Sequence, residues 1–364
     1  TPPRPLYLNY SLVGRLLLEK IFFLMIRRPP RSTLFYLRRQ RQMCIRDRTA
    51  DNVANTWVVT GADAGSVTGV TGGFSDIDNL TGGTGTDAFT LNGGTLSGTL
   101  SGGGAVTGNT LTADNVANIW GLTANDAGFV TGVNAFTGIG NLTGNASTDS
   151  FDFNDGVVVS GVVDGAGGND TLNWTAYNTA RNVTLTGAGS TDGFAGSEVS
   201  ITGGFDNINI FAGSGSADVL TAANIANTWL VTGIDSGTLN GNTFTNFADL
   251  TGGTATDTFT LNGGTLSGTI AGGGGAGVNT LTADNVANTW VVTGADAGSV
   301  TGVTGGFSDI DNLTGGTGTD AFTLSGGTLS GAIAGGGVAG ENTLTADNVA
   351  NTWIVTLADE VILS

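Results

Sequence analysis

The chain has 364 residues, a formal net charge of −18 at pH 7, 63 glycines and no histidine. Residues 1–48 carry a net charge of +9, whereas residues 49–364 carry −27 and have Arg181 as their single basic residue. So acidic a body excludes a phosphate-binding surface, and we expect neither nucleic acid nor an anionic lipid surface as a partner. Because it also lacks Cys, Lys and His, a Ser-His-Asp or Cys-His catalytic system, a Schiff base and an ordinary zinc site are excluded.

The first 48 residues differ sharply from the rest in composition. They hold all five prolines, and Glu19 and Lys20 interrupt an apolar run whose remainder, Ile21 to Ile26, is far shorter than the about 20 residues that span a bilayer. The segments "IFFLMIRRPPRSTLF" and "RQMCIRDR" closely resemble translated sequencing-adapter DNA, a contaminant of metagenomic assemblies. We therefore expect residues 1–48 to be a non-native leader, disordered or irregular, against the alternative of a genuine targeting segment.

The body, residues 49–364, consists of sequence repeats that begin near residues 49, 112, 166, 221, 282 and 345. Most copies open with "TADNVANTW" or a close variant, and residues 49–91 are identical to residues 282–324. Each copy contains one tryptophan, and we expect these side chains to be large core fillers or repeated surface aromatics. The tryptophans are Trp57, Trp120, Trp174, Trp229, Trp290 and Trp353. We expect the body to be a fragment of a longer protein.

The 63-residue repeat divides into three lengths of 21, in which Val59 falls above Leu80 and Ser101. Short segments such as "TWVVT", "AFTL" and "NTLT" are rich in strand-forming residues, and glycine-rich corners separate them. A fixed period of strand and turn predicts a solenoid, in which each coil buries its inner face by stacking on its neighbours. The sequence thus predicts an all-β parallel β-helix or β-solenoid of about 21-residue coils, three in each 63-residue repeat, rather than a disordered glycine-rich tract.

A recurring nonapeptide is the candidate site. "GGTGTDAFT", at residues 82–90 and 315–323, fits the pattern G-G-x-G-x-D-x-U-x, and three further copies fit it with lapses. These copies resemble the RTX calcium-binding repeat, and the resemblance implies Ca²⁺ ligands at the aspartate position: Asp87, Asp170, Asp218, Asp257 and Asp320. The copies are not in tandem, however, and calcium takes six to eight oxygens. Asp63, Asp76 or Asp78 of neighbouring coils would have to supply more. We therefore expect corners in which glycine adopts positive φ and Asp bonds local amides, with calcium as the alternative and no cofactor required.

Three other patterns are weaker candidates. Asp76 and Asp78, with their copies Asp309 and Asp311, are predicted to lie two apart on one strand face, as a paired-carboxylate hydrolase would need. They recur with the repeat, whereas a catalytic pair occurs once, so we expect no enzyme. Asn52 and Asn55 are expected to ladder inside the coils. Alternating threonines could form an ice-binding face, but we expect Gly and Asp to interrupt it.

In its repeat style and its Cys-free composition, rich in Gly, Thr and Asn, the body resembles the repeat regions of large bacterial surface adhesins. These are the filamentous-haemagglutinin-like proteins of two-partner secretion and the autotransporter adhesins. The resemblance implies a secreted, non-enzymatic structural or adhesive rod at the bacterial cell surface, with an unknown host or matrix receptor. It also implies that solenoids could associate laterally or end to end, without inserting into a membrane.

Overall fold

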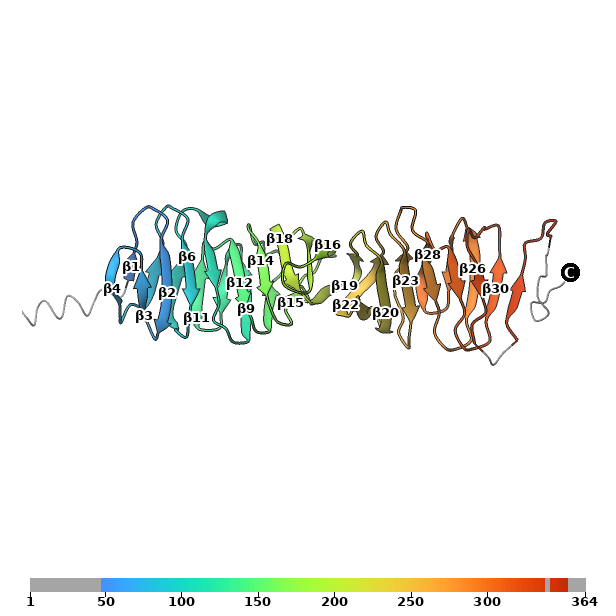
Figure 1. Ribbon diagram of the computed structural model, residues 1–364, viewed down its shortest axis with the longest axis horizontal. Helices are drawn as coiled ribbons and strands as arrows, with labels where there is room; N and C mark the ends of the chain where they lie inside the picture. Colours follow the sequence, from blue (N-terminus) through green and yellow to red (C-terminus); the bar gives the residue numbers. More distant parts are fainter. Residues whose placement is uncertain (1–46, 338–340, 353–364) are drawn as a thin grey trace, which may run out of the picture. The chain divides into compact units, whose positions relative to one another are not determined.

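The computed structural model describes residues 47–337 and 341–352, all of which belong to the unit Asp47–Ser364. Within these residues the protein is all-β: it has 32 strands, and the single helical element is the 3₁₀ turn η1 (Val106–Gly108). The strands form a long, mostly parallel sheet (Figure 1). The leader prediction falls outside the described residues except for Asp47 and Arg48, which begin β1 (Asp47–Thr49). Trp353 and the tail at residues 357–364 also lie outside them.

Strand pairing follows two continuous paths through this sheet. The first path runs through β1, β5 (Asn79–Thr81), β7 (Leu96–Ser101), β11 (Val133–Thr137), β10 (Ala127–Val130), β9 (Asn118–Ala124), β13 (Asp149–Phe153), β15 (Thr171–Asn173), β19 (Ile210–Thr221), β22 (Asn242–Thr251), β21 (Ser236–Leu239), β20 (Asn227–Gly233), β23 (Asp257–Leu261), β25 (Thr280–Thr282), β29 (Asn312–Thr314) and β31 (Ile333–Ala334).

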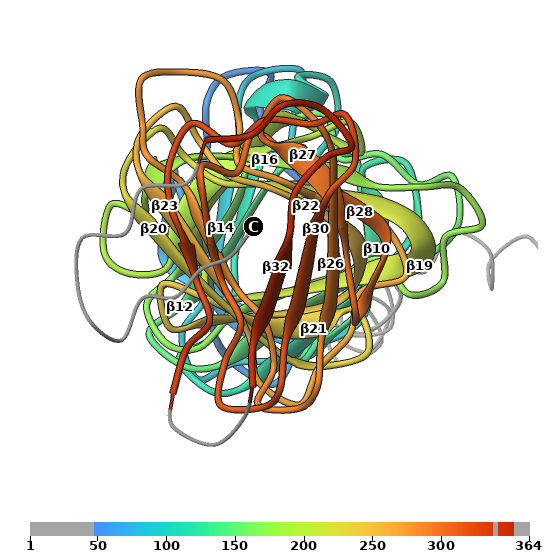
Figure 2. The same cartoon turned by 90° about the vertical axis from the view of Figure 1, so that its right-hand side faces the viewer.

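The second path runs through β4 (Val70–Phe74), β3 (Ala64–Val67), β2 (Thr56–Gly61), β6 (Ala88–Leu91), β8 (Thr110–Thr112), β12 (Asn141–Asn145), β14 (Val163–Ala166), β18 (Ile201–Ile208), β17 (Phe194–Glu198), β16 (Asn182–Ala188), the later parts of β19 and β22, β24 (Ile270–Ala271), β28 (Val303–Ser308), β27 (Ala297–Val300), β26 (Thr289–Gly294), β30 (Ala321–Leu324) and β32 (Thr343–Thr345). Seen along the long axis, the strands lie around a common centre (Figure 2).

Each repeat begins with three strands that stay on one path and then crosses between the paths. In the first repeat, β2, β3 and β4 belong to the second path, and β5, β6, β7 and β8 then alternate between the first and the second. The next repeat consequently opens on the first path, with β9. Because every complete repeat crosses an odd number of times, the three-strand unit is added to the two paths in turn.

The middle strand of each three-strand unit is antiparallel to both neighbours, which corrects the expectation of an entirely parallel β-helix. These strands are β3, β10, β17, β21 and β27. From the second repeat on, each return strand joins the first strand of its own repeat to a strand that ends a stack of earlier coils, as β10 joins β9 to β11, which pairs with β7. The ladder therefore continues without leaving an unpaired edge between repeats.

The three-strand unit also explains why dividing the repeat into three equal lengths of 21 residues predicted the wrong strand partners. Val59 pairs with Leu91, not with Leu80, because β3 and β4 lie between the two coils as a hairpin. Hydrogen bonds from a backbone N to a side-chain oxygen join residues 20–22 apart where they cross a coil without this hairpin, as for Asp87 and Asn109, and residues 30–34 apart where they cross a coil with it. Only the shorter separation matches the predicted coil.

The core lies between the strands and contains the five described tryptophans. Of the two alternatives that the sequence left open, core fillers or surface aromatics, the first is confirmed for these five. Trp57, Trp120, Trp174, Trp229 and Trp290 are fully buried. Four of them stack on a phenylalanine of the following coil, with ring centroids 5.4–5.7 Å apart: Trp57 on Phe89, Trp120 on Phe151, Trp229 on Phe259 and Trp290 on Phe322.

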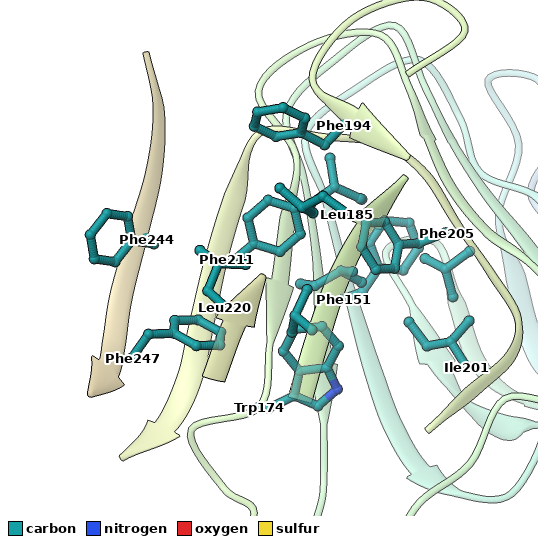
Figure 3. Close-up of a cluster of buried hydrophobic side chains, with 14 of the residues drawn as sticks. Phe151, Trp174, Leu185, Phe194, Ile201, Phe205, Phe211, Leu220, Phe244 and Phe247 are labelled. Carbon is teal, nitrogen blue, oxygen red and sulfur yellow. The ribbon is translucent and has the colours of Figure 1, made fainter. Parts of the chain in front are cut away.

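Trp174 does not occupy the same position as the other four. Its backbone N–H donates to Ala212, as the N–H of Ala113 donates to Thr143 in the preceding repeat, so Trp174 takes the place of an alanine. The position equivalent to Trp57 is held by Val183, which pairs with Leu220. Figure 3 shows this middle part of the core, where Trp174 lies among phenylalanines from several strands. Although the tryptophans are almost evenly spaced in the sequence, Trp174 occupies a different position in its coil from the other four.

Candidate functional site

The five aspartates of the nonapeptides are all fully buried. Asp257 shows the arrangement most completely. Its Oδ1 accepts hydrogen bonds from the backbone N (3.0 Å) and Nδ2 (2.7 Å) of Asn227, and its Oδ2 accepts one from the backbone N of Gly253 (2.8 Å). Its own backbone N donates to Oδ1 of Asn279 at 2.9 Å. One aspartate, through its carboxylate and its backbone N–H, therefore links three successive coils.

The same carboxylate–amide chain recurs in the other regular repeats. Asp87 accepts from the backbone N and Nδ2 of Asn55 and from the backbone N of Gly83, and it donates to Asn109. Asn288, Asp320 and Asn342 repeat the pattern near the end of the described chain. The expectation that Asn55 is architectural agrees with these contacts, although its side-chain partners are Asp87 and the carbonyls of Asp51 and Val53, not a stacked Asn or Thr.

In the copies that contain Asp87 and Asp257, glycine is required by close approach rather than by positive φ. A Cβ on Gly82 would lie 2.3 Å from Oδ2 of Asp87, and one on Gly83 would lie 2.1 Å from the carbonyl oxygen of Asp51 in the neighbouring coil. Neither residue has a positive φ. The first glycine has the same relation to its aspartate in every copy, with Cβ distances of 2.3–2.5 Å at Gly82, Gly144, Gly165, Gly213, Gly252 and Gly315. In the copies with Asp87 and Asp257 the expected left-handed corner is thus replaced by a crowded one, whereas Gly168, Gly215 and Gly316 of the other copies have the expected positive φ, of 135°, 137° and 100°.

Asp149 is a member of this set that the nonapeptide pattern missed. It is fully buried and accepts bonds from the backbone N (2.9 Å) and Nδ2 (2.6 Å) of Asn118, as Asp257 does from Asn227. Its loop, "GNASTDSF", lacks two of the glycines. The shorter pattern T-D-x-F, which ends at Phe89, Phe151, Phe259 and Phe322, would have found it.

Asp170 belongs to a different position from the one its nonapeptide implies. Its Oδ1 accepts from the backbone N of Asp149 at 2.7 Å, which is the role of Asn109 toward Asp87 and of Asn279 toward Asp257. Two carboxylates are therefore adjacent in this chain. Burial raises the pKa of Asp149 to about 6, although hydrogen bonds from Asn118 oppose the rise. Burial, with the charges of Asp149, Asp192 and Asp164, raises the pKa of Asp170 to about 7, against the hydrogen bond from Asp149.

Asp218 lies in the irregular middle repeat, where Arg181 replaces the asparagine. The backbone N of Arg181 donates to Oδ1 of Asp218 at 2.7 Å, and the Oδ2 of Asp218 accepts from Ser214 and Gly215. The guanidinium of Arg181 is buried and pairs with Glu198, with NH1 and Oε1 3.2 Å apart. It also lies over the ring of Tyr177, 4.1 Å from its centroid. The single base of the body is thus part of the core.

This ion pair extends into a polar network under Trp174. The indole Nε1 of Trp174 donates to Oγ of Ser200 at 2.9 Å, and Ser200 donates through its backbone N to Oε2 of Glu198 at 2.7 Å. Sequence reasoning noted Arg181 only as a charge, because the partners of a buried cation depend on which coils stack. A buried pair supplied with further hydrogen bonds offsets the desolvation of its charges.

The positions of the acidic side chains can be compared with what a calcium site needs. Within residues 47–337 and 341–352, no three side chains of His, Cys, Asp or Glu lie together so as to hold a metal ion. Of the suggested helpers, Asp63 accepts bonds from the backbone N (2.7 Å) and Oγ (2.9 Å) of Ser97. Calcium binding at the five aspartates stays a prediction.

The remaining weak candidates lie elsewhere. Asp76 and Asp309 have positive φ of 56° and 54° and lie in turns that follow β4 and β28, so the expectation of two carboxylates on one strand face is wrong. Asp311 accepts from the backbone N of Asn279 (2.7 Å) and from Oγ of Ser330 (2.6 Å). The carboxylate of Asp311 therefore helps to join coils.

Threonines form short rows across neighbouring strands, and the row of Thr90, Thr112 and Thr143 ends at Asp164, as expected. Thr260, Thr282 and Thr314 are in register on three consecutive strands. The row ends at Leu230 on one side and Ala334 on the other. It is too short to make the unbroken face of an ice-binding solenoid.

No family model matches the chain, and neither a curated protein nor a solved structure shows significant similarity to it. In the part of the chain that the structure describes, no helix is long and apolar enough to span a membrane.

Proposed function

We propose that residues 49–364 form a β-solenoid that serves as a non-enzymatic structural or adhesive rod segment of an exported bacterial surface protein. The observation that supports this most strongly is the carboxylate–amide chain itself. The polar groups that recur in every regular repeat are buried and bonded to the protein's own backbone, as Asp257 is to Asn227, Gly253 and Asn279. Groups so engaged join coils and are not presented to a substrate.

The two pairing paths support an extended form. The first path comprises 16 strands, and at about 4.8 Å between paired strands it would extend about 70 Å. A coil of this kind contacts only its neighbours, so the length can grow with repeat number. The high negative charge of residues 49–364 would keep such rods soluble and separate.

The competing hypothesis is a calcium-dependent module like the RTX repeats, and a titration separates the two. The full chain, purified in EDTA, should give a β-type circular dichroism spectrum and cooperative unfolding, because Asp87 and Asp257 already have N–H donors on both carboxylate oxygens. Adding calcium to millimolar concentration should leave the spectrum unchanged. A disordered chain in EDTA that gains β structure with calcium would replace the rod proposal by the calcium module.

The proposed rod shape can be tested by a second measurement, independent of calcium. Small-angle X-ray scattering of the full chain in EDTA should give a pair-distance distribution typical of a rod, with one short and one long dimension. A distribution typical of a compact sphere would contradict the proposed solenoid without depending on calcium.

A further inference from the structure

Asp170 occupies a position that elsewhere requires a hydrogen-bond donor. In the first repeat this position is Asn109, whose Oδ1 accepts from Asp87 while its Nδ2 donates to the carbonyl oxygens of Gly102 and Gly138, each at 2.9 Å. Asn279 likewise accepts from Asp257 and donates to the carbonyl oxygen of Asp309 at 3.0 Å. The side chain at this position therefore accepts with one atom and donates with the other.

The two atoms of Asp170 follow the same division of roles. Oδ1 accepts from the backbone N of Asp149, and Oδ2 takes the place of the amide nitrogen. A Cβ on Gly165 would lie 2.5 Å from Oδ2 of Asp170 and 2.2 Å from the carbonyl oxygen of Asn207. A Cβ on Gly102 would lie 2.5 Å from Nδ2 of Asn109 and 2.1 Å from the carbonyl oxygen of Gly138. Oδ2 of Asp170 thus faces a carbonyl oxygen, where two acceptors meet unless one carries a proton.

The surroundings of Asp170 offer it no positive charge. Its Oδ2 is buried and has no hydrogen-bond partner among the described residues, and the same holds for Oδ2 of Asp149 and Oδ1 of Asp192. Asp164, on β14, also faces it, and its Oδ1 accepts from Ala166 and Asn207. An ionised Asp170 would therefore be a buried charge beside three other carboxyl groups, and a buried charge without a partner is costly.

We propose that Asp170 is protonated on Oδ2 in the folded protein near neutral pH, where it donates to the main-chain carbonyl of Asn207 and acts as the amide does in the other repeats. Loss of this proton at higher pH makes the contact between these coils sensitive to pH. The strands that this contact holds together are β13, β15 and β19.

The sign of the pH dependence follows from the proton count. The pKa of Asp170 is raised from its ordinary 3.8 to about 7 on folding, so between these values the folded state binds more protons than the unfolded state. Stability therefore falls as pH rises across this window and levels off above pH 7. For Asp170 alone, the unfolding equilibrium constant should rise by roughly 100-fold between pH 5 and pH 8.

The test compares the full chain with two variants by urea unfolding at pH 5 and pH 8, in EDTA. Asp170→Asn restores the amide of the other repeats and should reduce the pH dependence of stability by the roughly 100-fold share of Asp170, while raising stability at pH 8. Asn279→Asp places a second carboxyl beside Asp257 and should steepen the pH dependence. Equal pH dependence in the full chain and in Asp170→Asn would overturn the proposal.

Difference infrared spectroscopy gives a second readout that does not depend on how the variants fold. The unmodified chain at pH 6 should show the carbonyl stretch of buried, protonated carboxylic acid, which disappears on raising the pH; Asp170→Asn should lose the part of this band that titrates near pH 7 and keep the part that Asp149 contributes near pH 6. A chain without that band at pH 6 would contradict the proposal. So would a stability at pH 8 that rises with calcium in the unmodified chain but not in Asp170→Asn, since a cation would then replace the proton.

Discussion

At the scale of single residues, the repeated aspartate and the first glycine of its motif depend on each other. The carboxylate of Asp257 turns back over Gly252 to reach the backbone N of Gly253, and this leaves no room for a side chain. The same pair occurs at Gly82 and Asp87. These contacts give the recurring Gly and Asp a role in packing and hydrogen bonding, whether or not calcium binds.

Gly252→Ala tests this role directly. The added Cβ would lie 2.3 Å from both Oδ2 of Asp257 and the carbonyl oxygen of Gly272, so the carboxylate must move and its bonds must lengthen. We expect the free energy of unfolding to fall by about 1–3 kcal/mol, as for other overpacked sites. Gly274→Ala is the control, because nothing lies within 4 Å of its Cβ; it should change stability by less than about 0.5 kcal/mol. Similar urea midpoints for the two variants would disprove this role.

At the scale of strands and their neighbours, the sequence predicts some features and conceals others. The strands around Trp57 and Phe89 and their burial could be predicted, because alternating apolar residues identify a buried face locally. The return strand β3 could not, since "AGSV" has the same small residues as the turns, and its antiparallel direction depends on which distant strand edge is open. That Asp170 holds the position of Asn109 rather than that of Asp87 could not be predicted for a similar reason: its partner Asp149 is defined only by coil stacking.

The stacked aromatic pair is the element-level contact whose strength can be measured. Trp229 stacks on Phe259 with centroids 5.6 Å apart and meets Phe244 edge-on at 5.7 Å. Trp229→Ala should lower the free energy of unfolding by about 3–5 kcal/mol, because a large buried ring is lost and a cavity remains. Trp229→Phe should cost clearly less, since the indole Nε1 has no hydrogen-bond partner among the described residues. If Trp229→Phe proves as destabilising as Trp229→Ala in urea titrations, the indole makes a contact other than packing.

At the scale of the whole repeat array, the alternation between the two pairing paths sets which lengths of chain can be removed. The third repeat already lacks one pair of crossings. After Val219–Thr221 of β19, the chain passes through Ala222 directly into β20, without equivalents of β24 and β25. Removing two crossings together leaves the next repeat on the same path as before, whereas removing one moves it to the other path.

Deletion of residues 261–282 therefore makes the fourth repeat like the third. It joins Thr260 to Ala283, just as Thr221 precedes Ala222, and it lets the later part of β22 pair with β28 once β24 is gone. We expect the shortened chain to keep its β-type circular dichroism and cooperative urea unfolding, because each coil contacts only its neighbours.

Deletion of residues 261–271 removes the crossing at β24 alone, so β25 and all later strands would meet the wrong path. That variant should lose cooperative unfolding beyond residue 260, measured by hydrogen exchange on β26 and β30. If the deletions of residues 261–282 and 261–271 fold equally well, an even number of removed crossings is not required and the alternation of paths does not constrain the fold.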